Sequence, residues 1–408
     1  MANTPNVRFE GFTGEWEERR LSEYLTVSTE KNKENIFDKT DVLSVSGDHG
    51  VVNQIEFQGR SFAGVSVSNY GVVHTGDVVY TKSPLRSNPY GIIKTNKGNS
   101  GIVSTLYAVY RPKENAFADF IQTYFEQHSR MNNYMQPLVN KGAKNDMKVS
   151  SENALKGIVV FPKYEEQKKI SAFLAYIEHF ITLHQRKYNG IKELKKYMLQ
   201  KMFPKNGRRI PEIRFAGFTG DWEQRKLGEL VEKYEDPVET PHDGYERLGI
   251  RSHAKGTFHS YVEAGKELEA AKMHRVAADK FIVNITFAWE HAVAITDDED
   301  AGLLVSHRFP QFSFHENLSS HFFKYVMLDR KFREHLELSS PGGAGRNRVL
   351  KIGDMLKYNI LFPSISEQAK IGGYFDEIDR LITLHQRKHD QLKEVKKFML
   401  QNMFPQKG

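Results

Sequence analysis

The sequence predicts an α+β protein in which one plan is used twice: two mixed α/β domains, joined and separated by two long antiparallel coiled-coil helices with pseudo-twofold symmetry. Residues 8–21 return at 214–227 with 10 of 14 positions identical, and residues 167–204 return at 368–405 with 21 of 38 identical. Between these blocks the two interiors share little. Internal repetition on this scale indicates a duplicated architecture.

The longer repeated blocks are predicted to be helices of about 35 residues, ~52 Å long at 1.5 Å per residue. Apolar and packing residues recur at alternating spacings of three and four, a period that favours a coiled-coil seam. Each block ends at Met-Phe-Pro, because proline cannot continue a helix. The predicted seam, which would also face partner subunits, comprises Leu174, Ile177, Ile181, His184, Tyr188 and Ile191 in the first helix and Phe375, Ile378, Ile382, His385, His389 and Leu392 in the second.

The repeat also predicts the domain boundaries: a first domain at 1–165, a first spacer helix at 166–204, a polar hinge at 205–210, a second domain at 211–366, and a second spacer helix with tail at 367–408. Runs at 71–82, 101–112 and 279–289 are rich in β-branched and aromatic residues between turn residues, which predicts strands. Residues 117–135 and 320–338 have helical periodicity. Each domain is therefore expected to be α+β.

Composition excludes several classes of protein. The 408 residues are 39% hydrophobic and 27% charged, which is too apolar for a disordered chain. The absence of cysteine excludes a disulfide scaffold, a thiolate zinc site, an iron–sulfur cluster and a cysteine nucleophile. Residues 1–6 lack the apolar core of a signal peptide, and no stretch approaches the length of a membrane span. We therefore expect a soluble, cytoplasmic protein with no membrane contact.

The charge is unevenly distributed along the chain. The formal net charge is +7, which suggests a polyanionic partner. Residues 167–201 carry eight basic and two acidic side chains, residues 22–165 carry 16 and 14, and residues 228–366 carry 17 and 21. If the second domain binds DNA, it must do so through a local patch.

Two glycine loops at equivalent places, 141–148 and 342–349, are the first candidates for such a patch. Glycine with Lys, Arg and Asn suits close approach to phosphates and base edges, although an exposed turn would have the same composition. The segment 82–88 and the basic residues around 247–255 are further candidates. The candidate DNA-binding residues are Lys82, Arg86, Lys141, Lys144, Asn145, Lys148, Arg251, His253, Arg346, Asn347 and Arg348.

Motifs for catalysis were sought and not found. The run Asn88-Pro89-Tyr90 lacks the second proline of the motif with which amino-methyltransferases hold a flipped base, and it has no copy in the other half. The repeated Gly-Phe-Thr-Gly lacks the Lys-Ser/Thr of a phosphate loop and better fits a turn that docks Trp16 and Trp222. No catalytic residue is predicted.

Two possible metal sites also favour structural interpretations. His385 and His389 have the i, i+4 spacing of metal ligands on a helix, but both lie in the packing stripe, and the first copy has Tyr188 at the second place. The acidic run 297–300 fits a solvated hairpin tip. No metal or cofactor is predicted for this chain.

Together these motifs resemble a known family. The duplicated Arg-Phe-x-Gly-Phe-x-Gly-x-Trp, the Phe-Pro…Glu-Gln-x-Lys-Ile helix start and the repeated Ile-Thr-Leu-His-Gln-Arg-Lys are similar, over essentially the whole chain, to the specificity subunit of type I restriction–modification systems. The resemblance implies that each interior is a target recognition domain that reads half of a split double-stranded DNA site. It also implies that the helices form a spacer and dock two copies of a methyltransferase subunit.

The same resemblance implies that the chemistry belongs to the partners. The methyltransferase subunit would bind S-adenosylmethionine and methylate adenine, and a restriction subunit using ATP with Mg would cut unmodified DNA. A rod of fixed length between two readers would set the half-site separation at about one to one and a half duplex turns. The interiors differ, so the site should be asymmetric. A coiled-coil tether or protein-interaction scaffold without DNA specificity remains the alternative, since neither domain is strongly basic.

Overall fold

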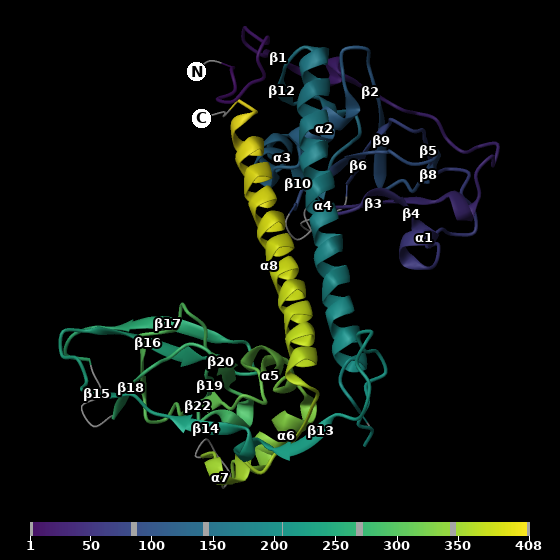
Figure 1. Ribbon diagram of the computed structural model, residues 1–408. Helices are drawn as coiled ribbons and strands as arrows, with labels where there is room; N and C mark the ends of the chain where they lie inside the picture. The colour runs from purple at the N-terminus through teal and green to yellow at the C-terminus, as the bar shows by residue number, and fades with distance from the viewer. Residues whose placement is uncertain are drawn as a thin grey trace. The chain divides into compact units, whose positions relative to one another are not determined.

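The computed structural model describes residues 3–82, 88–141, 147–205, 207–266, 272–342 and 348–405. The chain packs as two units, each with one domain and part of both long helices. Unit 1 comprises Met1–Gln185 and Arg387–Gly408, and unit 2 comprises Arg186–Gln386. Helices α4 (Tyr164–Lys201) and α8 (Ile365–Asn402) are each 38 residues long and contribute to both units (Figure 1). The predicted α+β class with two long helices is confirmed.

Unit 1 is built around a four-stranded antiparallel sheet in the order β2-β9-β6-β7, with smaller pairs β3-β4, β5-β8 and β10-β11 beside it. Three short helices accompany these sheets. The strands are β2 (Leu25–Val27), β3 (Leu43–Ser46), β4 (Gly50–Asn53), β5 (Gly71–Val73), β6 (Val78–Thr81), β7 (Ile93–Thr95), β8 (Gly101–Val103), β9 (Tyr107–Pro112), β10 (Asn140–Lys141) and β11 (Met147–Lys148), and the helices are α1 (Gln54–Gln58), α2 (Ala118–Tyr124) and α3 (His128–Met135).

Unit 2 repeats the four-stranded sheet as β14-β22-β19-β20 and adds a five-stranded sheet, β15-β18-β21-β16-β17. The extra sheet accounts for much of the difference between the interiors. The strands are β14 (Val231–Tyr234), β15 (Pro237–Val238), β16 (Tyr245–Ile250), β17 (Thr257–Val262), β18 (Met273–Arg275), β19 (Phe281–Val283), β20 (Val293–Ile295), β21 (Leu304–Ser306) and β22 (Gln311–Phe314), and the short helices are α5 (Ser320–Val326), α6 (Arg330–Leu338) and α7 (Ile352–Met355).

A two-stranded ribbon leads into the long helix in both units. In unit 1, β1 (Glu17–Arg20) pairs antiparallel with β12 (Ile158–Phe161), and in unit 2, β13 (Glu223–Lys226) pairs with β23 (Asn359–Phe362). The proline after each second strand cannot donate to a sheet, so the strand ends there and the helix follows.

A bidentate ion pair fixes the repeated Arg-Phe motif to the start of each long helix. Nε of Arg8 lies 2.7 Å from Oε1 of the buried Glu166, and Nε of Arg214 lies 2.7 Å from Oε1 of the buried Glu367. The second carboxylate oxygen accepts from the same guanidinium in each case. The pair explains why Arg and Glu recur together in the two blocks. Hydrogen bonding to Glu367 raises the pKa of Arg214.

The glutamine after that glutamate joins the helix to the domain. The fully buried Gln167 accepts from Phe117 N at 2.9 Å and donates to Asn115 O at 3.0 Å. Gln368 repeats these contacts with Ser319 N and Asn317 O, each at 2.9 Å. The Glu-Gln motif therefore has a structural role in both units.

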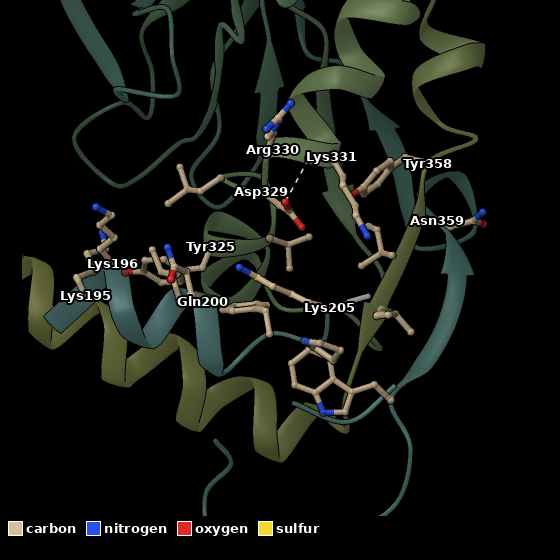
Figure 2. A pocket seen from close by; sticks show the side chains of 18 of the residues that line it. Lys195, Lys196, Gln200, Lys205, Tyr325, Asp329, Arg330, Lys331, Tyr358 and Asn359 are labelled. Atoms are coloured by element: carbon tan, nitrogen blue, oxygen red, sulfur yellow. Dashed lines mark hydrogen bonds between the residues drawn. The ribbon is translucent and has the colours of Figure 1, made fainter. Parts of the chain in front are cut away.

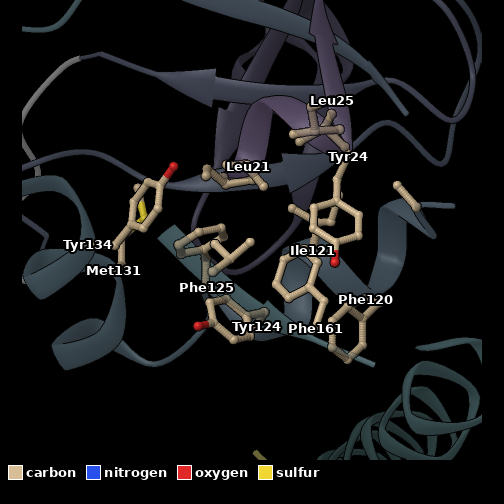
Figure 3. Close-up of a cluster of buried hydrophobic side chains, with 14 of the residues drawn as sticks. Leu21, Tyr24, Leu25, Phe120, Ile121, Tyr124, Phe125, Met131, Tyr134 and Phe161 are labelled. Carbon is tan, nitrogen blue, oxygen red and sulfur yellow. The ribbon is translucent and has the colours of Figure 1, made fainter. Parts of the chain in front are cut away.

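The hydrophobic core of each unit contains some of the predicted seam residues. In unit 1, Phe120 and Tyr124 of α2 pack on Phe161 of β12 (Figure 3). The predicted seam residues Leu174, Ile177 and Ile181 are buried in the same cluster as these rings, so this part of the stripe also packs on the domain. In unit 2, Phe375 and Ile378 are buried in the corresponding cluster.

The predicted turn around the Gly-Phe-Thr-Gly motif agrees with the structure. Gly11 and Gly14 adopt φ values of 89° and 83°, which favour glycine, and Gly217 and Gly220 adopt the same values. The tryptophan that follows each turn is buried in the core of its unit.

Two expectations about the second domain are wrong. The strand predicted at 279–289 ends at Val283, and residues 288–290 form a 3-10 helix, η6 (Ala288–Glu290). The acidic run 297–300 is not a hairpin tip, because it connects β20 to β21, which belong to different sheets. Asp300 in this run is buried and lies 2.8 Å from Nε2 of His259. Local composition does not show that an acidic side chain has a partner 41 residues away.

Candidate nucleic-acid interface

The β16–β17 hairpin of unit 2 ends in a tip, residues 251–256, that is fastened to η6. His253 N donates to Glu290 O at 2.9 Å, and Ala254 N donates to His291 O at 2.8 Å. His253 and Ala254 both have positive φ, a conformation that non-glycine residues adopt rarely. These hydrogen bonds hold the tip in that conformation and leave the side chain of His253 exposed.

The chain after the second glycine loop reaches the same place. Leu350 N donates to Ile285 O at 2.8 Å, just before η6. The guanidinium of Arg348 lies over the ring of Trp289, 5.4 Å from its centroid, and the guanidinium of Arg251 lies 5.3 Å from the centroid of Phe258. Arg251, His253 and Arg348, which are distant in sequence, are therefore brought together around η6.

Stacking on a ring orients a guanidinium without using all of its donors. The N–H edge remains available for a phosphate or for the acceptor edge of guanine. Arg348 also has a long ion pair with Glu337 at 3.7 Å, which holds the side chain only loosely. The exposed ring of Phe287 adds apolar surface beside η6. This combination of cations and aromatic rings suits contact with nucleic acid. We call residues 251–256, η6 and residues 348–349 the η6 surface.

The buried His291 supports the η6 surface. Its ring nitrogen Nε2 is 2.8 Å from Met327 O, and its backbone carbonyl accepts a hydrogen bond from Ala254 N. Burial lowers the pKa of His291, opposed by the hydrogen bond with Met327. The imidazole is therefore neutral near pH 7 and supports the tip without adding charge to it.

The candidate residues of unit 1 are described only in part. Lys82 is half-buried after β6, and burial lowers the pKa of its ammonium group. The backbones of Lys141 and Lys148 lie on the antiparallel pair β10–β11 at either end of the first glycine loop. Arg86, Lys144, Asn145, Arg346 and Asn347 lie outside the described residues.

Sequence patterns missed the residues that organise the η6 surface. The predicted strand 279–289 includes Trp289, and no sequence motif marks Glu290, yet Glu290 anchors the tip through its backbone and accepts from Ser252 Oγ at 2.7 Å. The signal in the sequence was the Phe-Ala-Trp-Glu run, whose large aromatic residues follow a strand that is already complete at Val283.

In each unit a lysine of one long helix ties the other long helix to the domain. In unit 1, Lys396 Nζ lies 2.9 Å from Glu178 of α4 and 3.2 Å from Glu126, which follows α2. In unit 2, Lys195 Nζ lies 2.5 Å from Asp379 of α8 and 5.2 Å from the ring centroid of Tyr325 in α5. Among the predicted seam residues, His389 is buried while His184, Tyr188, Ile191, Ile382, His385 and Leu392 are partly exposed. Their role in partner contact stays a prediction.

The described part of the chain holds neither a metal-binding cluster nor a membrane-spanning helix. No three His, Asp or Glu residues within it gather closely enough to hold a metal ion. None of its helices combines the length and apolarity required to cross a membrane.

Comparisons with known proteins agree on one family. Residues 219–394 match the family model described as the type I restriction modification DNA specificity domain. The MjaVIII specificity subunit, a type I restriction enzyme component from Methanocaldococcus jannaschii, is 22% identical over 256 residues. That match covers 59% of this chain and 59% of the relative, so it spans under two thirds of the relative's length.

Solved structures are similar over nearly the full chain. The S subunit of a type I restriction–modification system from M. genitalium has a TM-score of 0.56 at 10% identity, covering 99% of this chain and 100% of that one, which shows a shared fold. The HsdS subunit from Thermoanaerobacter tengcongensis has a TM-score of 0.44 at 14% identity, covering 95% and 96%.

Proposed function

We propose that this chain is the non-catalytic DNA-binding subunit of a type I restriction–modification system, a proposal supported by the match of residues 219–394 to the type I restriction modification DNA specificity domain. Each domain reads one half of a bipartite, asymmetric site in double-stranded DNA. The observation that carries the proposal is that the same sheet, ribbon and Arg–Glu pair frame two different interiors. Two readers of different sequence recognise two different half-sites.

The η6 surface is the proposed reader in unit 2. Arg251 and Arg348 present guanidinium edges above aromatic rings, and His253 is exposed between their segments. Residues 228–366 carry more acidic than basic side chains, so a local patch of this kind is required. Arg346 and Asn347 are proposed to contact DNA because they directly precede Arg348 in the sequence.

In unit 1 the proposal rests on sequence position. The residues proposed to contact DNA are Lys82, Arg86, Lys141, Lys144, Asn145 and Lys148. Residues 1–165 and 211–366 are the proposed target recognition domains, with 166–204 and 367–408 as spacer helices and 205–210 as the hinge.

Partner subunits complete the proposed complex. Two copies of a methyltransferase subunit dock on the spacer helices, since a duplicated chain offers two similar faces. They bind S-adenosylmethionine and methylate adenine, and restriction subunits use ATP with Mg to cut unmodified DNA. No cofactor is assigned to this chain, and no membrane partner is proposed.

Methylation mapping tests the proposal. DNA from cells with the chain and its methyltransferase partner is compared with DNA from cells that lack only this chain. We expect methyladenine at one split, asymmetric motif that depends on the chain. An unchanged pattern with an active partner and a folded chain would instead favour the tether alternative.

Variants then locate the reader in unit 2. Arg251→Ala and Arg348→Ala should each weaken binding to the second half-site by about 1–3 kcal/mol, with partner assembly intact. Arg225→Ala, which removes an exposed arginine from β13 outside the η6 surface, is the matched control. The measurement is the affinity for different DNA sequences at several salt concentrations. Loss of a phosphate contact alone would lower the affinity for all sequences equally. Unaltered site preference in both variants would exclude the η6 surface.

A further inference from the structure

Unit 2 contains a cleft of about 720 Å³ where the last turns of α4 meet the start of α6 and strand β23 (Figure 2). This volume lies in the range typical of small-molecule sites. One wall of the cleft is apolar and aromatic. It is formed by Leu199, Phe203, Trp222, Tyr358 and Ile360. The DNA-reading role proposed above does not use this cleft.

Charged side chains, most of them positive, surround the apolar wall. Five lysines and two aspartates line the cleft, an excess of three positive charges: Lys192, Lys195, Lys196, Lys205 and Lys331 against Asp329 and Asp379. Arg330 also borders the cleft, but its side chain points away from it and pairs with Glu334 at 2.6 Å (Figure 2).

Both aspartates already have partners within unit 2. Asp379 accepts from Lys195 at 2.5 Å and from Tyr325 Oη at 3.0 Å. Asp329 caps α6 by accepting from Lys331 N at 3.1 Å. The acidic side chains are thus engaged in holding the elements of the cleft together.

Three lysines of the cleft are not paired with an acid. Within the described residues, the ammonium groups of Lys192, Lys205 and Lys331 have no carboxylate within 4 Å, and that of Lys192 donates to Tyr188 Oη at 3.3 Å. The other two are Lys205 and Lys331. Figure 2 shows both side chains extending into the cleft from different elements. Two ammonium groups that line one cleft without a counter-ion favour binding of a ligand with several negative charges.

The corresponding region of unit 1 is built differently. Lys393, Lys396 and Lys397 occupy the repeated positions and also line a cavity. The ring equivalent to Phe203, however, is covered: the guanidinium of Arg130 lies 4.8 Å from the centroid of Phe404. An aromatic wall beside the helix lysines is therefore open in unit 2 and covered in unit 1.

We propose that the cleft of unit 2 binds a nucleoside polyphosphate. The base lies against the rings of Phe203 and Tyr358, where a planar group gains both apolar burial and stacking. The phosphates are held by Lys205 and Lys331, with Lys196 at the rim. The volume accommodates a mononucleotide, and the excess positive charge matches a polyphosphate chain. One site per chain is proposed, because among the described residues the ring of unit 1 that is equivalent to Phe203 is covered by Arg130.

Equilibrium dialysis of the purified full-length chain tests the site. ATP, GTP, adenosine and inorganic triphosphate are compared as probes at the same ionic strength. We expect one mole of ATP or GTP per mole of chain, and at least tenfold weaker binding of both adenosine and triphosphate. Triphosphate binding as tight as that of ATP would overturn the proposed stacking, and no ATP binding up to about millimolar concentration would overturn the site.

Matched variants locate the binding. Lys196 and Lys397 are equivalent in the repeat, are similarly exposed, and each lies 4.0 Å from a glutamate three residues earlier. Lys331→Glu and Lys196→Glu should each weaken ATP binding by tenfold or more, while Lys397→Glu should leave it unchanged. Equal loss in the two matched variants would refute the assignment to unit 2.

A competition measurement separates the site from the DNA-reading surface. Excess duplex carrying the mapped methylation motif should leave ATP bound. Displacement of ATP by duplex would show that the cleft contacts the DNA backbone and would overturn the nucleotide proposal without affecting the methylation map.

Discussion

Replacing Lys396 by methionine is expected to destabilise unit 1 by about 2–3 kcal/mol. Burial acts to lower the pKa of Lys396, but Glu126 and Glu178 together outweigh it and raise the pKa above its ordinary value. Methionine keeps the apolar stem and removes the charge, so the loss reports the ion pairs and not the packing.

The magnitude follows from the exposure of the partners. Lys396 and Glu126 are 23% and 22% exposed, which places their pair between exposed pairs, worth up to ~1 kcal/mol, and buried pairs, whose disruption costs about 3–5 kcal/mol. About 2 kcal/mol is therefore assigned to Glu126. Glu178 is 52% exposed, so its pair adds roughly 0.5 kcal/mol or less.

Urea unfolding followed by hydrogen–deuterium exchange measures the two units separately. Lys397→Met is the control, because that lysine is 67% exposed and should cost less than about 0.5 kcal/mol. In a double-mutant cycle with Glu126→Gln, a coupling of about 1–2 kcal/mol is expected. A loss below about 0.5 kcal/mol for Lys396→Met, or no coupling to Glu126, would refute the reasoning.

Three further predictions concern the frame of each unit. Arg214→Lys should lower the stability of unit 2 by about 1–3 kcal/mol in denaturant unfolding, because one ammonium group cannot form the bidentate pair with Glu367; an unchanged midpoint would contradict this. Burial opposes ionisation of Asp376, but hydrogen bonds from Tyr325, His321 and Lys324 lower its pKa, so its contribution to stability is present above the unfolded value near pH 3.9 and is lost as pH falls through the folded pKa. Acid unfolding of Asp376→Asn should therefore depend less on pH below about 4 than that of the unaltered chain, and equal slopes would exclude this role. Gly91→Ala should destabilise unit 1 by more than about 2 kcal/mol in thermal unfolding, because its φ is 85° and a Cβ would lie 1.9 Å from Thr81 O; a neutral result would show that this turn relaxes freely.

The large-scale plan could be predicted from the sequence because its signals are local. The repeated blocks, the 3.5-residue stripe and the terminal Met-Phe-Pro each lie within one continuous segment, and both long helices were located within a few residues of their observed ends. The pairing of Arg8 with Glu166 was not predicted, although both belong to the repeated motifs. The two residues lie 158 positions apart, and no local pattern records which distant segments meet.

The η6 surface shows the same limit at the level of a site. Composition makes both Arg251 and Arg348 candidates, but only the fold brings the tip that carries Arg251 to η6, where Arg348 lies over Trp289. That contact depends on positive φ at His253 and Ala254. Non-glycine residues give no sequence signal for that conformation, because tertiary hydrogen bonds impose it. The burial of Asp300 escapes local patterns for a related reason, since its partner His259 lies in strand β17, 41 residues away.

The contacts of Gln167 and Gln368 have a consequence for how such chains diversify. Each glutamine meets its domain at two points, a backbone amide and a backbone carbonyl: Phe117 N and Asn115 O for the first, Ser319 N and Asn317 O for the second. Any residue supplies the carbonyl, and any residue other than proline supplies the amide. The contact between helix and domain therefore depends little on the domain's side chains. An interior could be exchanged for another of the same fold without a change in the helix that holds it.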